Sequence, residues 1–255
     1  PLYEVKGEAM GLYQYETSDI KKTARIDRLI ANLFAKMPEI EPARAKLITE
    51  SYKETENEPM IIRRAKAFAH ILENIPIIIR EDELVVGSTT LAPRGCQTYP
   101  EFSYEWLEAE FDTVERRSAD PFYISEETKR EIREADRYWK GKTTSELATA
   151  YMEPETLSAM AHNMFTPGNY FYNGVGHVTV QYEKVLAIGF EGIRKEAEDL
   201  LSDCDLGDGD YAKKARFLQA VMISCDAVIT YARRYAHLAE QMAKECKDPV
   251  RKAEL

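Results

Sequence analysis

The chain has 255 residues, of which 44% are hydrophobic and 31% charged, a balance typical of an ordinary globular protein with one large domain or two small ones. Its net charge of −10 argues against nucleic acid and anionic membranes as partners. No apolar run approaches the roughly 18 residues of a membrane helix, no signal peptide opens the chain, and no Cys-x-x-Cys pair is present. These features predict a cytoplasmic protein, or one in a compartment inside the cytoplasm, with free thiols.

The first third of the chain is predicted to be mostly helical. Residues 1–22 have no clear period and are expected to form an extended leader, whereas 23–255 form the folded part. Apolar spacing predicts helices at 23–36, 42–54 and 59–74, with Pro38 and Pro42 setting a turn between the first two. The third helix is expected to turn six apolar side chains inward: Ile61, Ile62, Ala65, Phe68, Ala69 and Leu72.

Two short apolar runs, 77–79 and 84–87, are expected to form short strands or buried turns around a solvated acidic segment at 81–83. Residues 91–99 contain Pro93 and Gly95 and are predicted to form a loop.

Further helices are predicted along the rest of the chain, at 104–111, from 125, from 143 or 144, from 154, at 184–201, at 213–247 and from 249. Ser125 is a favourable N-cap, Thr143 has Glu146 at capping-box spacing, and Pro154 suits a first helical turn. The predicted architecture is therefore mainly α with a few short strands.

A glycine-rich stretch at 166–193 contains the strongest candidate for a site. It holds five of the twelve glycines, three consecutive aromatic residues at 170–172, and His177 directly after Gly174 and Gly176. An alternating run at 177–182 predicts a short strand. Glycine permits unusual backbone conformations, so this turn could aim the imidazole of His177 into a ligand cavity beside an aromatic wall. A core histidine bonded to the backbone is the alternative, and the pattern alone leaves both open.

The other candidate residues favour structural roles. His70, His162 and His237 lie in or beside helical stretches, and no second histidine stands at metal-ligand spacing, so no metal site is predicted. Cys96 follows Arg94 in a loop, where a thiol can become nucleophilic, but a small packing residue is the favoured interpretation.

Several segments resemble the glycyl radical enzymes, and within them the cobalamin-independent dehydratases of 1,2-propanediol or glycerol. The matching segments are 45–51, 83–88 (Glu-Leu-Val-Val-Gly-Ser), 97–102, 138–149, 168–177 and 223–227. The resemblance extends over about 25–255 and implies the N-terminal part of the α/β barrel fold of pyruvate formate-lyase-like proteins.

The resemblance also implies a reaction. A glycyl radical, installed by an iron–sulfur activase that uses S-adenosylmethionine, generates a cysteine thiyl radical that converts the diol to an aldehyde and water. His177 would bind the substrate hydroxyls and protonate the one that departs, with Asn169 and Tyr172 as further substrate-binding residues. A homodimer, located in the cytoplasm or in a bacterial microcompartment, is implied as well. No cofactor is expected to bind to this chain.

The chain departs from that family in length and in its radical motifs. None of its four cysteines has glutamate two residues later, and no glycyl loop is present. The helical pattern that restarts at Pro249 also stops without a C-cap. We therefore expect an N-terminal portion that is inactive alone and is completed by the remainder of the same polypeptide or by a second one.

Two alternatives remain at this point. One is another glycyl radical lyase acting on choline, isethionate or hydroxyproline, although the choline branch has aspartate where this chain has Tyr172. The other is a non-catalytic helical module for binding or assembly. The leader could serve as a targeting segment.

Overall fold

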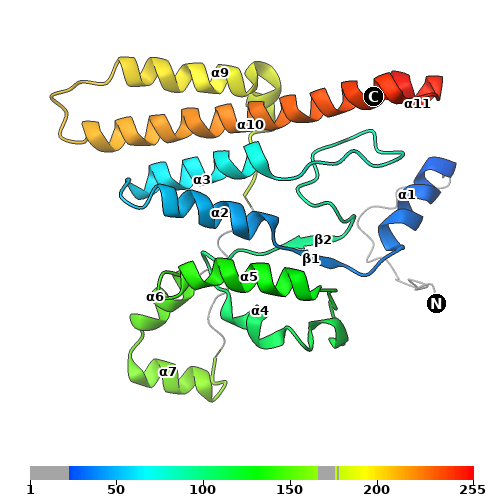
Figure 1. Ribbon diagram of the computed structural model, residues 1–255. Helices are drawn as coiled ribbons and strands as arrows, with labels where there is room; N and C mark the ends of the chain where they lie inside the picture. The colour runs from blue at the N-terminus through cyan, green and yellow to red at the C-terminus, as the bar shows by residue number, and fades with distance from the viewer. Residues whose placement is uncertain (1–22, 166–175, 177) are drawn as a thin grey trace, which may run out of the picture.

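The computed structural model describes residues 23–165, 176 and 178–255 (Figure 1). The leader at 1–22 lies outside the described residues. The helices are α1 (Ala24–Phe34), α2 (Ala43–Glu54), α3 (Met60–Asn74), α4 (Glu105–Glu110), α5 (Glu126–Trp139), α6 (Thr144–Ala150), α7 (Pro154–Ala161), α9 (Tyr182–Ser202), α10 (Tyr211–Glu245) and α11 (Pro249–Glu254), with a 3-10 turn at Val114–Arg116. The strands are β1 (Glu39–Glu41) and β2 (Gly95–Gln97).

Local signals set the starts of α5, α6 and α7 where the sequence predicts them. Ser125 Oγ accepts from the Thr128 backbone N–H at 3.0 Å, which begins α5. Thr143 and Glu146 form the expected reciprocal capping box at α6, and Pro154 occupies the first turn of α7. Each cap satisfies backbone N–H groups that have no partner inside the helix.

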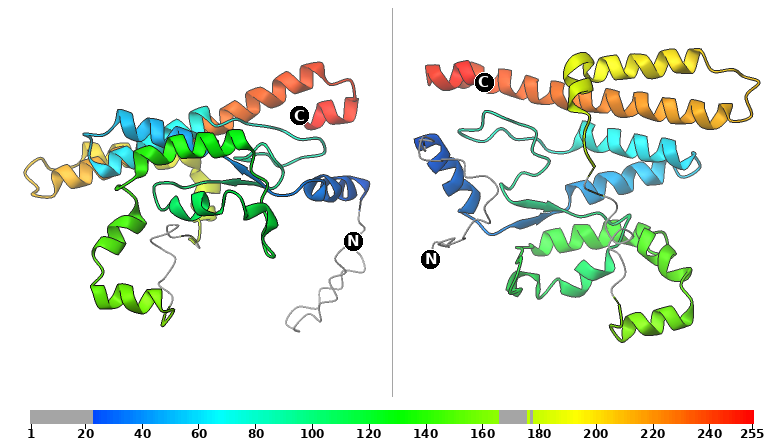
Figure 2. Two further views of the ribbon diagram at one scale, coloured as in Figure 1. Left: turned by 60° about the horizontal axis from the view of Figure 1, so that its bottom comes forward. Right: turned by 180° about the vertical axis from the view of Figure 1, so that it is seen from behind.

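The helices form stacked layers (Figures 1 and 2). α9 and α10 run antiparallel along one side, and α10 packs on α3, which packs on α2. α2 in turn contacts α5 and β2, while α4, α6 and α7 lie beyond α5. The long helix predicted at 213–247 is confirmed as α10, whose 35 residues run without a break.

The two strands form a small parallel sheet in which Ile40 is paired with Cys96. Ile40 is buried in a core cluster with Leu107, Phe111 and Ile132. The predictions of a turn at 38–42 and of a loop throughout 91–99 were therefore wrong in part. Glycine is required at position 95 of β2, because the Cβ of any other residue would lie 2.4 Å from Thr90 Cβ, which is too close.

Neither apolar run, 77–79 or 84–87, forms a strand, so the first of the two predicted alternatives is wrong. Leu84 and Val85 are 62% and 88% exposed, so the second run is not a buried turn either. The acidic segment between the runs is not simply solvated, because Asp82 is buried and accepts hydrogen bonds from Arg28 of α1.

Two further local predictions need correction. Residues 178–180 have no regular structure instead of forming a strand, and α9 contains a kink at Gly189. In α3, Ile62, Ala65 and Leu72 are buried as predicted, but Ile61 and Phe68 are each 40% exposed. The inward face of α3 is therefore narrower than the apolar pattern suggests.

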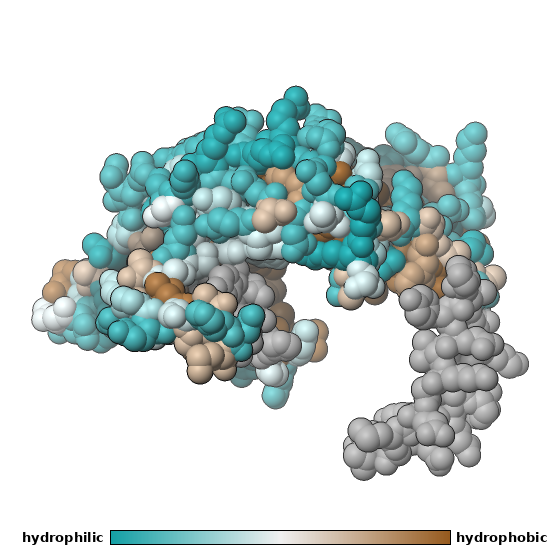
Figure 3. All heavy atoms as spheres, turned by 90° about the horizontal axis from the view of Figure 1, so that it is seen from below, coloured by the Kyte–Doolittle hydropathy of each residue, from teal (hydrophilic) through white to brown (hydrophobic). Residues whose placement is uncertain are grey.

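The surface carries apolar patches among hydrophilic regions, as the view from below shows (Figure 3). α1 is the clearest case among the described elements, because none of its residues is buried although its apolar residues share one face. No helix among the described residues is both long enough and apolar enough to cross a bilayer.

Candidate functional site

The predicted site residues His177, Asn169 and Tyr172 lie outside the described residues, so their geometry stays a prediction. Among the described residues, Phe165 precedes Asn169 and Tyr172 in the sequence and lies just beyond α7, and Gly176 directly precedes His177 and lies before α9. α7 and α9 lie on opposite sides of the molecule in Figure 1.

A cleft of about 570 Å³ opens between α2, α3, β2 and the α5–α6 junction. Its lining is largely aromatic and aliphatic, with four charged side chains, those of Arg44, Arg64, Glu101 and Lys142. Cavities of this size with few polar groups are where proteins commonly bind small molecules. Among the residues that the structure describes, this cleft is the central candidate site.

The aromatic wall of the cleft is built from Trp139 and Tyr52. Their ring centroids lie 4.9 Å apart, and the Trp139 indole N–H donates to Thr49 Oγ1 at 2.8 Å. Trp139 is the last residue of α5, whereas Tyr52 and Thr49 share one face of α2. The hydrogen bond satisfies the only polar atom of the buried indole and fixes the orientation of the ring.

An arginine anchors the opposite side of the cleft. The Arg44 guanidinium donates to the Glu101 carboxylate and to the Thr98 carbonyl, each at 3.1 Å. It also lies 3.8 Å from the Tyr99 ring centroid, a cation–π distance. Both charged side chains are largely buried, so the pair holds the 98–101 segment firmly against the start of α2.

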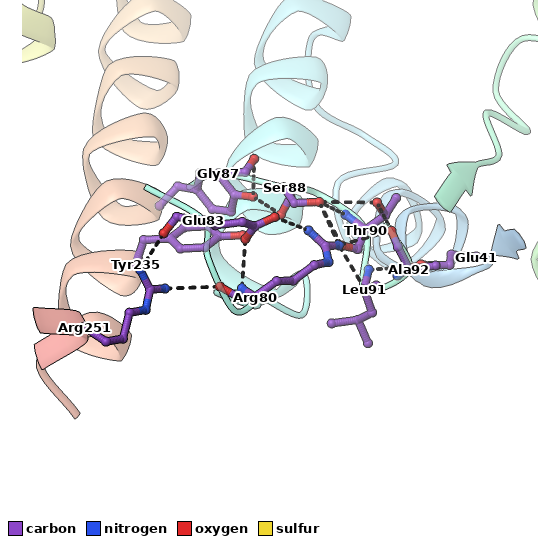
Figure 4. Close-up of polar contacts among 11 residues, drawn as sticks. Glu41, Arg80, Glu83, Gly87, Ser88, Thr90, Leu91, Ala92, Tyr235 and Arg251 are labelled. Atoms are coloured by element: carbon purple, nitrogen blue, oxygen red, sulfur yellow. Dashed lines mark hydrogen bonds and ion pairs between the residues drawn. The ribbon is translucent and has the colours of Figure 1, made fainter. Parts of the chain in front are cut away.

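The Glu-Leu-Val-Val-Gly segment of 83–87 belongs to a loop that is fixed by polar contacts (Figure 4). Arg80 extends through the loop and donates to the carbonyl oxygens of Thr90, Leu91 and Ala92 at 2.9–3.1 Å. Its guanidinium also pairs with Glu83 at 2.9 Å. One arginine thus replaces the strand hydrogen bonds that the apolar pattern predicted.

α10 and α11 close the same loop from the other side (Figure 4). The hydroxyls of Tyr231 and Tyr235 donate to the Ser88 carbonyl at 2.9 and 2.6 Å, and Arg251 donates to the Glu83 carbonyl at 2.8 Å. Burial raises the pKa of Tyr231 well above its ordinary value, so this hydroxyl stays a donor. Gly87 adopts φ +125°, which explains the glycine at this position.

Asp136 is the most strongly perturbed carboxyl of this region. It is 3% exposed, and one of its oxygens has no hydrogen-bond partner among the described residues. Burial, together with the neighbouring Glu108 and Glu105 carboxylates, raises the pKa of Asp136 to about 8. The side chain therefore holds a proton near neutral pH.

Two thiols and two imidazoles in the described part of the chain have environments that suit structural roles. Burial raises the pKa of Cys96, which lies in β2, and that of Cys225, which disfavours the thiolate. His162 contacts the Ser158 carbonyl, and His237 contacts Gln241. Within the described residues, no group of three or more His, Cys, Asp or Glu side chains could hold a metal ion.

Sequence reasoning missed the central cleft and the role of Arg80. The segments that resemble the glycyl radical enzymes pointed to the cleft, because three of them contribute lining residues: 45–51, 97–102 and 138–149. Their convergence was not predictable, since Trp139 and Thr49 are 90 residues apart.

Comparison with known proteins establishes the family. The family model described as pyruvate formate lyase-like matches residues 17–255. The chain belongs to this family, and the resemblance to glycyl radical enzymes is confirmed.

Two solved structures show which members the chain is similar to. One concerns 1,2-propanediol dehydration in Roseburia inulinivorans: it is 68% identical with a TM-score of 0.89, over 92% of this chain and 28% of that chain. The other is the glycerol-bound B12-independent glycerol dehydratase of Clostridium butyricum, which is 50% identical with a TM-score of 0.88, over 96% of this chain and 30% of that chain.

A more distant relative belongs to a different lyase type. The isethionate sulfite-lyase of Desulfovibrio desulfuricans is 36% identical over 92% of this chain and 29% of its own length. The chain thus spans less than a third of each of these relatives. Its relatives are lyases that include dehydratases.

Proposed function

We propose that this chain is the N-terminal portion of a glycyl radical diol dehydratase that converts 1,2-propanediol to propanal and water. The observation that carries the proposal is the 68% identity to the structure that concerns 1,2-propanediol dehydration, against 50% to the glycerol dehydratase and 36% to the isethionate lyase. Glycerol is the second candidate substrate. The barrel of the complete fold would be completed by polypeptide beyond these 255 residues.

The residues of this chain would bind the substrate and move a proton, without carrying the radical. His177 would hydrogen-bond the diol and protonate the departing hydroxyl, because water leaves more easily than hydroxide. Asn169 and Tyr172 would orient the diol by further hydrogen bonds. The glycyl radical and the thiyl cysteine would be supplied by the remaining polypeptide after activation by an iron–sulfur activase.

The assembly and location follow as parts of the same proposal. We infer a homodimer that works in the cytoplasm or inside a bacterial microcompartment. The alternatives are a glycyl radical lyase for another substrate, such as isethionate or hydroxyproline, and a non-catalytic assembly module.

A substrate panel tests the proposal. The full-length protein that contains this chain, activated to a measured radical content, is assayed with 1,2-propanediol, glycerol, isethionate and hydroxyproline. We expect propanal from 1,2-propanediol with the highest kcat/KM, and no aldehyde from the 255-residue chain alone. Preference for isethionate or hydroxyproline would overturn the assignment as a diol dehydratase, and turnover by the isolated chain would overturn the division of roles.

The role of His177 is tested by substitution in the full-length protein. His177→Ala should mainly lower kcat, by about 100-fold to 10,000-fold, because a general acid acts as the hydroxyl departs. His162→Ala is the matched control, since His162 is exposed and contacts only its own helix. A His177→Ala variant that keeps kcat and KM within about threefold of wild type, well short of a general-acid effect, would identify a structural histidine.

A further inference from the structure

An apolar groove of about 500 Å³ lies between α3, α9 and α10, and we call it the α3–α10 groove. Its apolar lining includes the side chains of Ile61, Phe68, Phe190, Phe217, Val221 and Val228. Three of these side chains are open to water: Ile61 and Phe68 are each 40% exposed, and Phe217 is 55% exposed. The described part of the chain therefore leaves a hollow apolar surface uncovered.

The groove is one part of a larger hollow face that follows α3. Ile61, Arg64 and Phe68 are separated by three and four residues, so they share one side of this helix. Arg64 and Phe68 line both the groove and the central cleft. Ile61 and Phe217 line both the groove and a further cavity of about 640 Å³ at the N-terminal ends of α3 and α10. Three neighbouring cavities thus meet along one stripe of α3.

α3 carries apolar side chains on more sides than the described fold buries. The helix lies between α10 and α2 (Figure 1). Ile62 and Ala65 belong to a core cluster with α10, and Ala67 belongs to a cluster with α2, whereas Ile61 and Phe68 stay partly exposed. Contiguous apolar surface that remains exposed marks an interaction site. The stripe is therefore a surface on which further protein can pack.

The unpaired charges of this face are mainly basic, although the chain has a net charge of −10. Arg64, Lys213 and Arg216 line its cavities, and none of them makes a side-chain hydrogen bond or ion pair with a described residue. Asp210 is the carboxylate beside them. The other charged side chains are paired: Arg44 with Glu101, Lys142 with Glu56 and Lys214 with Asp208. An apolar partner with carboxylates at its edge would complement this face.

The length of the relatives points to that partner. The chain covers only 28% and 30% of the two solved relatives, so most of a full-length protein of this kind lies outside it. Covalent attachment gives the remaining polypeptide a high effective concentration at this face. A free ligand or a second copy would instead lose translational and rotational freedom on binding. The remaining polypeptide is therefore the favoured occupant.

We propose that the α3 stripe and the α3–α10 groove form the surface on which the remaining polypeptide of the full-length protein packs, through an apolar segment with carboxylates opposite Arg64 and Arg216. The inference rests on the proposed function, which requires that polypeptide, and adds the face of this chain that receives it. Because Arg64 and Phe68 also line the central cleft, the same packing closes one side of that cleft.

Photo-crosslinking in the full-length protein tests the proposal. p-Benzoylphenylalanine replaces Phe217, and the cross-linked peptides are identified by mass spectrometry after irradiation. We expect cross-links at the mass of a single chain that reach residues outside the 255 of this chain. The same replacement of Glu127, on the exposed face of α5, is the control and should give no such cross-link.

The other outcomes of the cross-linking experiment overturn the proposal. Cross-links at the mass of a dimer would assign the face to a second copy. Cross-links confined to these 255 residues, or the absence of any cross-link from position 217, would show that the remaining polypeptide does not cover the groove.

Cysteine labelling tests the contribution of charge. In the full-length protein, Phe217→Cys should react with a maleimide at least about tenfold more slowly than Glu127→Cys, because a covered thiol reacts only when the contact opens. Adding Arg64→Glu should raise the rate at position 217 toward that at 127, and adding Arg64→Gln should give an intermediate rate. Arg130→Glu, at an exposed ion pair of α5, is the matched control and should leave the rate at 217 unchanged.

Equal labelling at positions 217 and 127 would overturn the proposal, as would a rate at 217 that neither Arg64 variant changes. A wild-type circular dichroism spectrum shows that each variant remains folded. These measurements and the substrate panel fail separately. Propanal formation by a protein with an open groove would overturn this inference alone, whereas a covered groove with preference for another substrate would overturn the diol assignment alone.

Discussion

At the scale of single residues, Asp136 is the group whose environment departs most from that in water. Its carboxyl is buried beside Glu108, and neither side chain can donate a hydrogen bond to the other while both are ionised. Because its folded pKa of about 8 lies far above the ordinary value of 3.8, the folded state keeps a proton that the unfolded state releases. The contribution of Asp136 to stability is therefore complete below about pH 4 and decreases as the pH rises toward about 8.

Asp136→Asn should remove this pH dependence. The amide is neutral at every pH and can donate a hydrogen bond to Glu108. As the pH rises through part of the range from about 4 to about 8, the free energy of unfolding of the variant should therefore increase relative to that of the wild type by about 1.4 kcal/mol per pH unit. Urea unfolding of both proteins at a series of pH values measures the difference. Glu134→Gln, on the exposed side of the same helix, controls for the loss of one charge. A parallel pH profile for wild type and Asp136→Asn would contradict the raised pKa.

At the scale of elements, the kink in α9 depends on one glycine. Gly189 has φ 63° and ψ −179°, a conformation that is essentially confined to glycine. An added Cβ would meet nothing within 4 Å, so the obstacle to substitution is the backbone conformation and not crowding. The kink changes the direction of the chain between the predicted His177 region and the rest of α9.

Gly189→Ala should destabilise the fold by about 1–3 kcal/mol, the usual cost of a side chain in such a conformation. Gly209→Ala is the matched control, because its Cβ also meets nothing within 4 Å and its φ is not in the left-handed range. Thermal unfolding compares the two variants with wild type. If Gly189→Ala were as stable as Gly209→Ala, α9 would tolerate a continuous helix at this position, and the kink would not be required.

At the scale of the whole molecule, ionic contacts attach α1 to the rest of the fold. Arg28 pairs with the buried Asp82 at 2.5 Å, and Arg25 pairs with Glu254 of α11. α1 itself buries no residue. These contacts join α1 to the loop at 80–92 and to α11. Ion pairs, more than the burial of apolar side chains, therefore position α1.

Asp82→Asn should loosen α1 selectively. The hydrogen bonds and charge of Arg28, with the further charges of Arg25 and Arg251, hold the pKa of Asp82 below its usual value, so the interaction is present at neutral pH and is lost as the pH falls through that lowered pKa. Hydrogen exchange at neutral pH should become faster in α1 of the variant, and added salt should narrow the difference because it screens the pairs.

Asp120→Asn provides the control for this experiment. Asp82 and Asp120 both have positive φ, 68° and 49°, which asparagine tolerates, but Asp120 is exposed. Equal exchange in α1 of both variants would show that the ionic contacts do not hold the helix.

The helices of this protein were largely predictable, because the signals that begin and end them act within a few residues. Ser125, Thr143 and Pro154 mark helix starts without reference to the rest of the chain. The apolar period likewise identified α10 to within two residues at each end. The family could also be identified from short segments, and the family model confirmed it.

The sheet, the loop and the cleft could not be predicted in this way, because they depend on partners far away in the chain. β1 pairs with β2 more than fifty residues later, and the Val-rich run at 84–87 stays out of any strand because Arg80 and α10 bind its flanks. Likewise, the raised pKa of Asp136 depends in part on two carboxylates of α4, those of Glu108 and Glu105. Local backbone preferences decide where a helix forms. Tertiary packing alone decides which distant polar groups meet. Bringing them together lowers the conformational entropy of the chain, and only the contacts of the folded state offset that loss.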